Sequence, residues 1–548
     1  MPVHELFYYI SEDIDPYFMK RALITVIAII LCTAAGAQSP SFYNVRDFGA
    51  AGDGTAIDSP AINSAIDAAS QAGGGTIYFP AGTYMSYSVR LKDNITLYLD
   101  SGAVLKAAKA TAEAGYDEAE PNDSAYQDFG HSHWHNSLIW GEGLHDVSIV
   151  GQGLIDGSDG LSRGLGRVEA IAWANKAIAL KECRNVTIKD ISMLMCGHFA
   201  LLLTGVDNLT IDNVRVDTNR DAFDIDCCAN VRISNCLVNS LNDDGIVLKS
   251  SWALGYLKCT ENVTITNCQV SGYDPGSMLA GTFTKNITAA PDRDGPTGRI
   301  KFGTESNGGF RNITISNCVF DHCRGLALET VDGAVIEDIT IDNIAMRDIV
   351  NSPFYIRLGN RHRAPDGLPF STVRRVRISN VTVKDADCRY ASIIMGLEGH
   401  NIEDVTLSGI HIQYKGGLTM EDVKQQTPAN SFFNRGKTGR EDPYDVPQMA
   451  DGYPEPSSHG ILPAYGLYIS HARNISIEDV KLETIEPDGR PAIVLQDVEG
   501  IRLHNMSVQL SDGAAPIVVN KVKSLEIKDF EGLKDSVVKA SDTLRTLR

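Results

Sequence analysis

The sequence predicts an all-β fold, a single parallel β-helix with a capping helix at its N-terminal end. Two observations predict the solenoid: a short strand-like phrase recurs along the chain, and several of its copies are separated by 22–26 residues. A third observation predicts the cap, because an amphipathic helical segment precedes the repeats.

The repeated phrase alternates polar and aliphatic residues, which is the period of a half-buried strand. Its copies begin at Asn94, Asp146, Asn185, Asn208, Asn230, Asn262, Asn312, Asp338, Arg375, Asp404, Asn474 and Gly500. Repeats of this length without intervening helices predict stacked parallel strands, and the Asn after a copy is expected to form a ladder with its equivalents in adjacent coils. Neither the Leu-x-x-Leu-x-Leu signature of leucine-rich repeats nor the longer units of a β-propeller are present.

The cap and first strands are expected over residues 38–90 and the solenoid over residues 91–530. Asp58-Ser-Pro predicts a helix start, and the residues after it form one apolar face that would cover the end of the solenoid: Ala61, Ile62, Ala65, Ile66 and Ala69. Two stretches lack the repeat, near 271–298 and 413–466, and are predicted to be loop insertions. Aromatic residues in the second stretch favour a loop folded over the solenoid.

The N-terminus predicts export. Met19-Lys20-Arg21 precedes an apolar run of about ten residues and Ala35-Gly-Ala37, the order of a signal peptide with a small-residue cleavage site. We therefore expect residues 1–37 to be a leader that starts at Met19, and the mature protein to be periplasmic or extracellular. The run is too short to span a bilayer, so no membrane contact is expected after cleavage.

The net charge of −20, without any basic tract, argues against a nucleic-acid or anionic-membrane partner. Ten of the eleven cysteines follow the leader, and Cys236, Cys268 and Cys318 each end the same phrase. That recurrence favours a ladder of buried thiols over a disulfide framework. The oligomeric state is not predicted.

Acidic residues are densest in Asn219-Arg-Asp221-Ala-Phe-Asp224 and in Asn242-Asp243-Asp244-Gly. If 22 residues make one coil, Asp221 stacks near Asp243, with Asp244 beside it. Carboxylates this close raise one another's pKa, so that one stays protonated as an acid while the others act as bases, as glycosidic hydrolysis requires. Isolated aspartates such as Asp212 and Asp342 are instead expected to fill turns.

These segments resemble motifs of glycoside hydrolase family 28, the polygalacturonases and rhamnogalacturonan hydrolases. Asn219-Arg-Asp221 with Asp224 resembles Asn-Thr-Asp-Gly-x-Asp, and the text from Asp243 to Lys249-Ser resembles Asp-Asp-Cys-x-Ala-x-Lys-Ser. The stretch that begins at Asn44 resembles the start of many pectin-degrading β-helices, and coverage runs from about 42 to 510.

The resemblance implies a right-handed, pectin-lyase-like solenoid. It also implies an inverting hydrolase of α-glycosidic bonds in a pectic polysaccharide, with no cofactor or metal. In that scheme Asp243 protonates the leaving oxygen, while Asp221 and Asp244 activate water.

Two family motifs are altered. Gly298 stands where Gly-His-Gly carries its histidine, and Arg324-Gly-Leu-Ala-Leu-Glu329 replaces Arg-Ile-Lys, whose cations hold a galacturonate carboxylate in the family. Arg299-Ile-Lys301 matches that second motif by its letters but comes one repeat too early. Because Glu329 would repel a uronate, the substitution favours a neutral sugar such as rhamnose in that subsite, and so a rhamnogalacturonan over a homogalacturonan.

The candidate substrate-binding residues are Asp224, Lys249, Arg299, Lys301, Glu305, Glu329, His198 and Trp134. The three cations either hold a uronate at another subsite or balance the charges of Asp221, Asp243 and Glu305. His198, 23 residues before Asp221, either lines the groove or sits in a core or turn.

The segment His131-Ser-His133-Trp134-His135 favours a sugar-stacking tryptophan and a substrate-bonding histidine over a zinc site. Two alternatives to the hydrolase remain: a Ca²⁺-dependent lyase that acts by β-elimination, and a non-catalytic polysaccharide-binding solenoid. The stacked aspartates argue against both. Which sugar flanks the bond, and whether cleavage is internal or terminal, stays open.

Overall fold

The computed structural model describes residues 42–121, 126, 129–161, 174–287, 294–426 and 439–548. Residues 43–548 form one compact unit, and the predicted leader lies outside the described residues. Within the described part of the chain, no helix has the length and hydropathy needed to cross a membrane.

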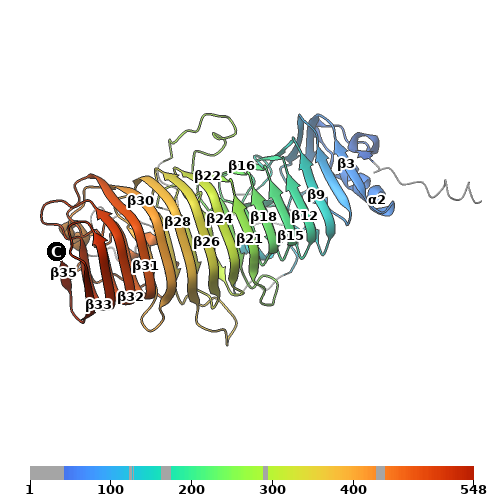
Figure 1. The fold of residues 1–548 in the computed structure, drawn as a ribbon. Helices are drawn as coiled ribbons and strands as arrows, with labels where there is room; N and C mark the ends of the chain where they lie inside the picture. The colour runs from blue at the N-terminus through green and yellow to red at the C-terminus, as the bar shows by residue number, and fades with distance from the viewer. Residues whose placement is uncertain (1–41, 122–125, 127–128, 162–173, 288–293, 427–438) are drawn as a thin grey trace, which may run out of the picture. The chain divides into compact units, whose positions relative to one another are not determined.

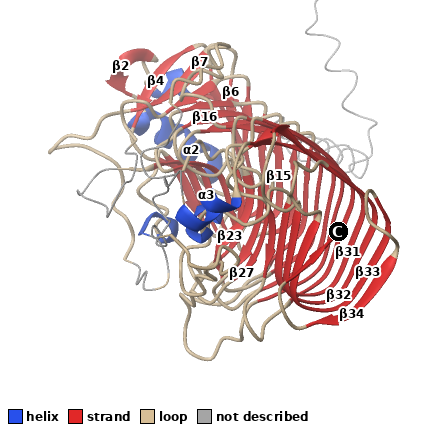
Figure 2. Ribbon diagram, turned by 90° about the vertical axis from the view of Figure 1, so that its left-hand side faces the viewer, coloured by secondary structure: helices blue, strands red, loops and turns tan. Residues whose placement is uncertain are grey.

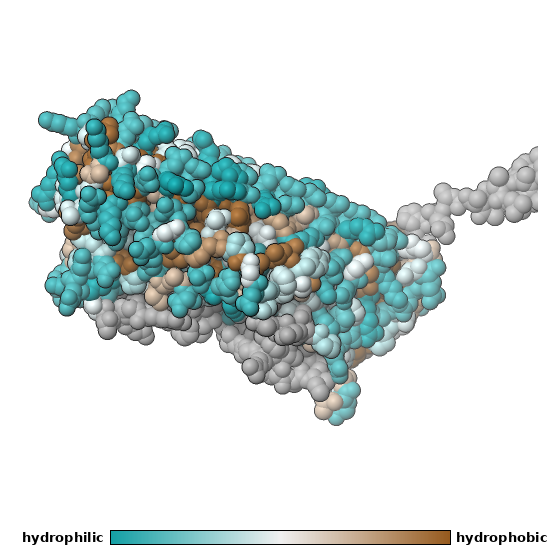
Figure 3. Space-filling model, turned by 90° about the horizontal axis from the view of Figure 1, so that it is seen from below, coloured by the Kyte–Doolittle hydropathy of each residue, from teal (hydrophilic) through white to brown (hydrophobic). Residues whose placement is uncertain are grey.

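The predicted parallel β-helix is confirmed. Thirty-five strands belong to one continuous sheet wound into successive coils (Figure 1). Figure 2 shows the stack from a second side, with only short helices among the loops. In Figure 3 hydrophilic residues cover most of one face, and apolar residues gather in patches along its middle, as is usual for protein surfaces.

Three faces follow from the strand pairings. The first face contains β5 (Val89–Arg90), β8 (Ile139–Glu142), β11 (Lys176–Lys181), β14 (Phe199–Thr204), β17 (Asp221–Asp226), β20 (Ile246–Ser250), β23 (Ile300–Ser306), β25 (Leu326–Thr330), β27 (Phe354–Leu358) and β29 (Ser392–Met395). The second contains β1 (Phe42–Asn44), β3 (Gly75–Phe79), β6 (Ile95–Leu99), β9 (His145–Gly151), β12 (Arg184–Lys189), β15 (Asp207–Asp212), β18 (Ala229–Ser234) and β21 (Thr260–Thr266). The third contains β2 (Asp53–Ile57), β4 (Gly82–Ser86), β7 (Ala103–Ala107), β10 (Leu154–Asp156), β13 (Ser192–Leu194), β16 (Arg215–Thr218), β19 (Leu237–Ser240) and β22 (Gln269–Ser271).

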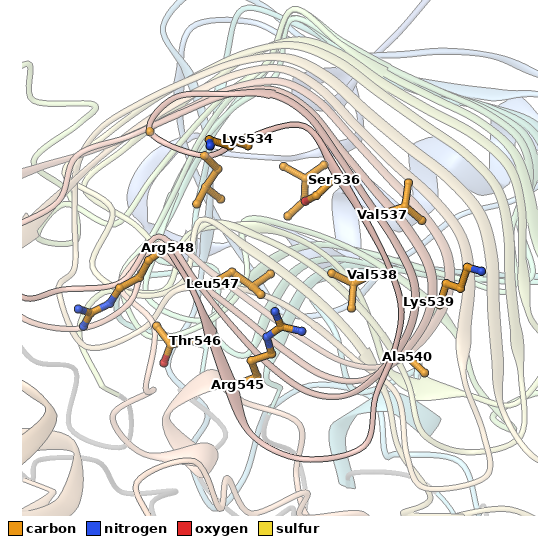
Figure 4. Close-up of a pocket in the computed structure, with 13 residues that line it drawn as sticks. Lys534, Ser536, Val537, Val538, Lys539, Ala540, Arg545, Thr546, Leu547 and Arg548 are labelled. Atoms are coloured by element: carbon orange, nitrogen blue, oxygen red, sulfur yellow. The ribbon is translucent and has the colours of Figure 1, made fainter.

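Longer strands join the faces towards the C-terminus. They are β24 (Phe310–Asp321), β26 (Val335–Arg347), β28 (Thr372–Ala386), β30 (Ile402–Gly416), β31 (Leu467–Glu486), β32 (Ile493–Val508) and β33 (Ile517–Phe530). The last strands, β34 (Ser536–Ser541) and β35 (Arg545–Leu547), run antiparallel to β33 and line a pocket of about 790 Å³ (Figure 4). An antiparallel hairpin thus closes the C-terminal end of the solenoid.

The coils bend at the first residue of each repeated phrase. All twelve of these residues have positive φ, from 53° at Asn312 to 71° at Gly500. Asn, Asp and Gly tolerate this left-handed region better than other residues, which explains why they recur at this position. Their amides also bond from coil to coil, as in Asn208 to Asn185 at 3.0 Å. The predicted ladder of following asparagines is confirmed too, for example by Asn343 to Asn317 at 2.7 Å.

The interior is one apolar column that includes Cys236, Cys268 and Cys318. All ten cysteines after the leader are free thiols, and burial raises the pKa of several of them. The thiol ladder is therefore confirmed, and the cysteines act as small apolar residues.

The predicted capping helix is α2 (Ser59–Gln71). Ile62, Ala65, Ile66 and Ala69 are buried, and Ala61 is half-buried. The Asp58 carboxylate accepts bonds from the backbone N–H groups of Ala51 and Gly52 instead of capping α2. The described residues also contain three 3-10 turns: η1 (Val45–Phe48), η2 (Phe129–Ser132) and η3 (Pro456–His459).

The second predicted insertion begins after β30 and contains α3 (Met420–Gln425) and η3. We call its described C-terminal part, residues 439–466, the strap. The strap is bound to the first face: Arg357 donates to the carbonyl oxygens of Gln448 and Met449, and the hydroxyl of Tyr355 bonds to His459. A loop folded over the solenoid is thus confirmed for these residues.

Candidate active site

Strand register on the first face brings the predicted polar residues together. Asp224 of β17 pairs with Val247 of β20, which pairs with Lys301 of β23. The offset from β17 to β20 is 23 residues, whereas Thr218 and Ser240 in the preceding strands are 22 apart. The prediction that Asp221 lies near Asp243 with Asp244 beside it is confirmed. The offset of 23 instead of 22 arises because the turn before β20 is one residue longer.

That extra residue places both Asp243 and Asp244 next to Asp221. One carboxylate oxygen from each of Asp221, Asp243 and Asp244 lies within 4.8 Å of the other two. The three side chains are nearly buried, with residue exposures of 4 %, 7 % and 3 %. Asp221 belongs to β17, and the other two belong to the turn that leads into β20.

The cationic partners of the three carboxylates differ. Arg220 lies 2.8 Å from Asp243, and Asp244 lies 3.0 Å from Arg299 and 3.2 Å from Lys301. The imidazole of His198 lies 3.7 Å from Asp221 and bonds to Arg220 at 3.3 Å. Asp243 and Asp244 thus each face at least one cation.

Burial, and then the charge of Asp243, raises the pKa of Asp221 to about 8. Two close carboxyl groups titrate as a pair, so the raised pKa of Asp221 favours a protonated form of the Asp221–Asp243 pair near neutral pH. The family resemblance assigns the acid to Asp243.

A buried layer of charges supports the aspartates. Asp224 has no exposed surface; it lies 2.7 Å from Lys249 and 3.2 Å from His131. Lys249 also lies 3.5 Å from Glu305. Although burial opposes the charged form, Asp224 and Glu305 hold the pKa of Lys249 above its usual value. A buried layer of paired charges, made of Asp224, Lys249, His131 and Glu305, therefore lies beside the three aspartates.

Arg299 and Lys301 belong to a second network beside Asp244. Both contact Glu329, at 3.6 and 3.5 Å, and Arg299 also lies 3.2 Å from Glu455 of the strap. Burial raises the pKa of Glu329 to about 7 against the opposing effect of the two cations. Both cations are therefore paired with carboxylates. These carboxylates are Asp244, Glu329 and Glu455 instead of the expected Asp221, Asp243 and Glu305.

Ten of the eleven predicted site residues converge here, and Trp134 does not. Trp134 has no exposed surface, packs with Phe199 and Leu202, and donates its indole N–H to Thr204 at 3.1 Å. The prediction that it stacks on a sugar is wrong, because both faces of its ring contact protein.

The histidines around Trp134 have separate surroundings. His131 lies at the site beside Asp224, while His133 bonds to the carbonyl oxygen of Glu120. His135 stacks on Trp140 with 3.9 Å between ring centroids. In the described part of the chain, Asp221, Asp243 and Asp244 are the one group of potential metal ligands that converges. Since Arg220, Arg299 and Lys301 already neutralise two of these carboxylates, the arrangement favours proton transfer.

Sequence reasoning missed several residues of the site. Arg220 lies inside the motif around Asp221 and contacts Asp243, and Arg361 contacts Glu305 and Asp332. Glu455 and Tyr453 come from the strap, and Tyr453 bonds to Lys301 at 3.2 Å. The strap lacks the repeat, so no register could have placed them.

Two family models match successive parts of the chain and support the fold. Residues 42–140 match the model described as "Rhamnogalacturonase A/epimerase, pectate lyase-like", and residues 154–290 match "Right handed beta helix region". The solenoid is right-handed, as expected.

A probable polygalacturonase of Vitis vinifera is 28 % identical over 216 residues, which are 38 % of this chain. The match spans only 44 % of the grapevine protein, less than half of its length. The crystal structure of a Thermotoga maritima exopolygalacturonase superposes with a TM-score of 0.55 and 20 % identity, over 69 % of this chain and 88 % of that one. The chain is a right-handed parallel β-helix that is similar to polygalacturonases over part of its length.

A further relative is the plasmin and fibronectin-binding protein A of Streptococcus pneumoniae. It is 33 % identical over 178 residues, which cover 31 % of this chain and 23 % of that protein. The motifs that resemble family 28 lie at the buried residues Asp221, Asp243 and Asp244.

The pKa of Asp221 predicts how stability depends on pH. In the unfolded chain this carboxyl titrates near 3.8, whereas in the fold it titrates near 8. Between these values the folded state retains a proton that the unfolded state releases, so the contribution is complete below pH 4 and is lost as pH rises through 8. We expect Asp221→Asn to melt close to the wild type at the acid end and several degrees above it at the alkaline end.

The measurement is the difference in thermal midpoint between variant and wild type over that pH range. Asp512→Asn, at an exposed turn, is the matched control and should show no such trend. A constant difference across the range would show that Asp221 is ionised throughout.

Proposed function

We propose that this chain is an exported glycoside hydrolase that cleaves α-glycosidic bonds in a pectic polysaccharide. The observation that carries the proposal is the convergence of Asp221, Asp243 and Asp244 at the positions of the family 28-like motifs, where burial raises the pKa of Asp221. The similarity to polygalacturonases supports a pectic substrate, and the leader sequence supports export.

The geometry supplies an acid and a base on one sheet face. Asp243 is the most exposed of the three aspartates, and it receives the shared proton as the substrate binds. It donates this proton to the glycosidic oxygen as the bond to the anomeric carbon breaks. Water attacks that carbon and gives its proton to the base formed by Asp244 and the now ionised Asp221. The products are two sugars with free hydroxyl groups.

We propose that the reaction inverts the anomeric carbon. Oxygen atoms this close fit the short carboxylate separation of retaining enzymes better than the roughly 6.5–9.5 Å typical of inverting ones. Two points nevertheless favour inversion: the resemblance to family 28 implies it, and each oxygen of Asp244 faces a cation, Arg299 or Lys301, which weakens that carboxylate as a nucleophile.

Inversion predicts that the first product formed from an α-linked substrate is the β-anomer. Proton NMR during the first minutes, before mutarotation, reads this directly. Early accumulation of the α-anomer would contradict the mechanism and place a covalent intermediate on an aspartate.

The polymer preference is tested by separate incubation with rhamnogalacturonan and homogalacturonan. Glu329 is paired with Arg299 and Lys301, so these cations are less able to bind a uronate. We therefore expect faster release of sugars from rhamnogalacturonan than from homogalacturonan. Asp243→Asn should lower kcat by about 100-fold or more, as loss of a general acid does. Asp342→Asn is the control and should retain nearly full activity, because Asp342 lies in strand β26 on another face. The expectation that Asp342 fills a turn is wrong, since its backbone pairs with that of Ser316 in the sheet.

Two other outcomes would replace the proposal. Unsaturated, ultraviolet-absorbing products that disappear with a chelator would indicate a lyase. Binding without any product, unchanged in Asp243→Asn, would indicate a non-catalytic solenoid, as the similarity to the streptococcal binding protein allows.

We further propose that cleavage proceeds from chain ends, because the strap lies against β23 and β27 beside the aspartates. The time course of products tests this: a single small sugar from the earliest time points is expected. Early release of mixed oligomers would show internal cleavage.

A further inference from the structure

Six buried charges lie together beside Asp244, and their formal charges cancel. The cations are Arg299, Lys301 and Arg324; the anions are Asp244, Glu329 and Glu455. Each of the six residues has 3 % exposure or less. A buried cluster that is already neutral gains little from another ion, because that ion would lose its hydration without gaining an unpaired partner.

Glu455 occupies a central position in this cluster. One of its oxygens lies 3.2 Å from Arg299, and the other lies 3.0 Å from Arg324 and accepts a bond from Asn351 at 3.1 Å. Glu455 therefore engages two guanidinium groups that would otherwise be able to bind a carboxylate of the substrate in bidentate fashion.

The strap also covers the remaining cation. Lys301 donates to the hydroxyl of Tyr453, which is half-buried, and its ammonium group lies 5.4 Å from the centre of that ring. A sugar that reaches Asp244 from this side thus meets the amphipathic tyrosine and a neutralised cluster. Neutral sugars suit such a surface, whereas a uronate does not.

We propose that Glu455 of the strap determines specificity: with Glu329 it neutralises the cations beside Asp244, so that this subsite takes a neutral sugar instead of a uronate. The inference rests on the proposed hydrolase function, but it concerns selectivity alone. It explains how a chain with Arg299 and Lys301 next to the reacting position can still discriminate against an anionic residue.

The experiment measures equilibrium binding of methyl α-D-galacturonoside and methyl α-L-rhamnoside by titration calorimetry or ligand-observed NMR. Glu455→Gln and Glu329→Gln each remove one negative charge without a change in shape, from two different elements. In each variant we expect galacturonoside affinity to rise by about tenfold or more, because a buried cation loses its partner. Rhamnoside affinity should stay within about twofold of wild type.

Glu441→Gln is the matched control, since Glu441 lies in the same strap but is exposed. It changes the net charge equally and should leave both affinities unchanged. A melting curve for each variant identifies any that does not fold. The affinities measured with either folded variant are enough to test whether the cations beside Asp244 are neutralised against a uronate. Unchanged galacturonoside affinity, or an equal gain for both sugars, would overturn the inference.

This readout is separate from hydrolysis. If neither polymer is cleaved but Glu455→Gln gains galacturonoside binding, the hydrolase proposal fails and the selectivity stands. If rhamnogalacturonan is cleaved but no variant gains uronate binding, the hydrolase stands and the role of Glu455 is wrong.

Discussion

The parallel hydrogen-bonded ladder between coils is the constraint on which the rest of this structure depends. It fixes each strand against the one before it, so that a residue's position in the repeat decides which side chains it meets. The site exists because this constraint is relaxed at one place. A turn one residue longer than its predecessor lets Asp243 and Asp244 both approach Asp221, while Asp224 and Val247 resume the regular pairing.

Because so many charges are buried, nearly all of them need an oppositely charged partner. Asp221 is the carboxylate of the site with the weakest pairing. Asp224, Asp243 and Asp244 each lie next to a cation at 3.0 Å or less. Among the described residues, the ion-pair partner of Asp221 within 4 Å is the imidazole of His198, at 3.7 Å, and Lys249 and Arg220 act on it from farther away. An uncompensated carboxyl beside a compensated one takes up a proton, and this asymmetry gives a group of chemically identical side chains two roles.

Much of the fold could be predicted from the sequence because its determinants are local. The left-handed residues, the alternating strands and the cap from Ser59 each leave a short pattern in the chain. The carboxylate cluster was predictable for the same reason, within one position of register. The burial of Trp134 and the approach of Glu455 depend on tertiary packing, and neither the repeat nor a motif encodes it.

Arg299 joins the two halves of the site, since it contacts Asp244 on one side and Glu455 on the other. If Glu455 were neutral, the field of Arg299 would act on Asp244 with less competition and weaken it as a base. In the proposed hydrolase, selectivity against an anionic sugar and the strength of the base are therefore coupled through one guanidinium group. The strap supplies Glu455 to that group, so under this proposal the loop outside the repeat takes part in the chemistry together with the strands that carry the aspartates.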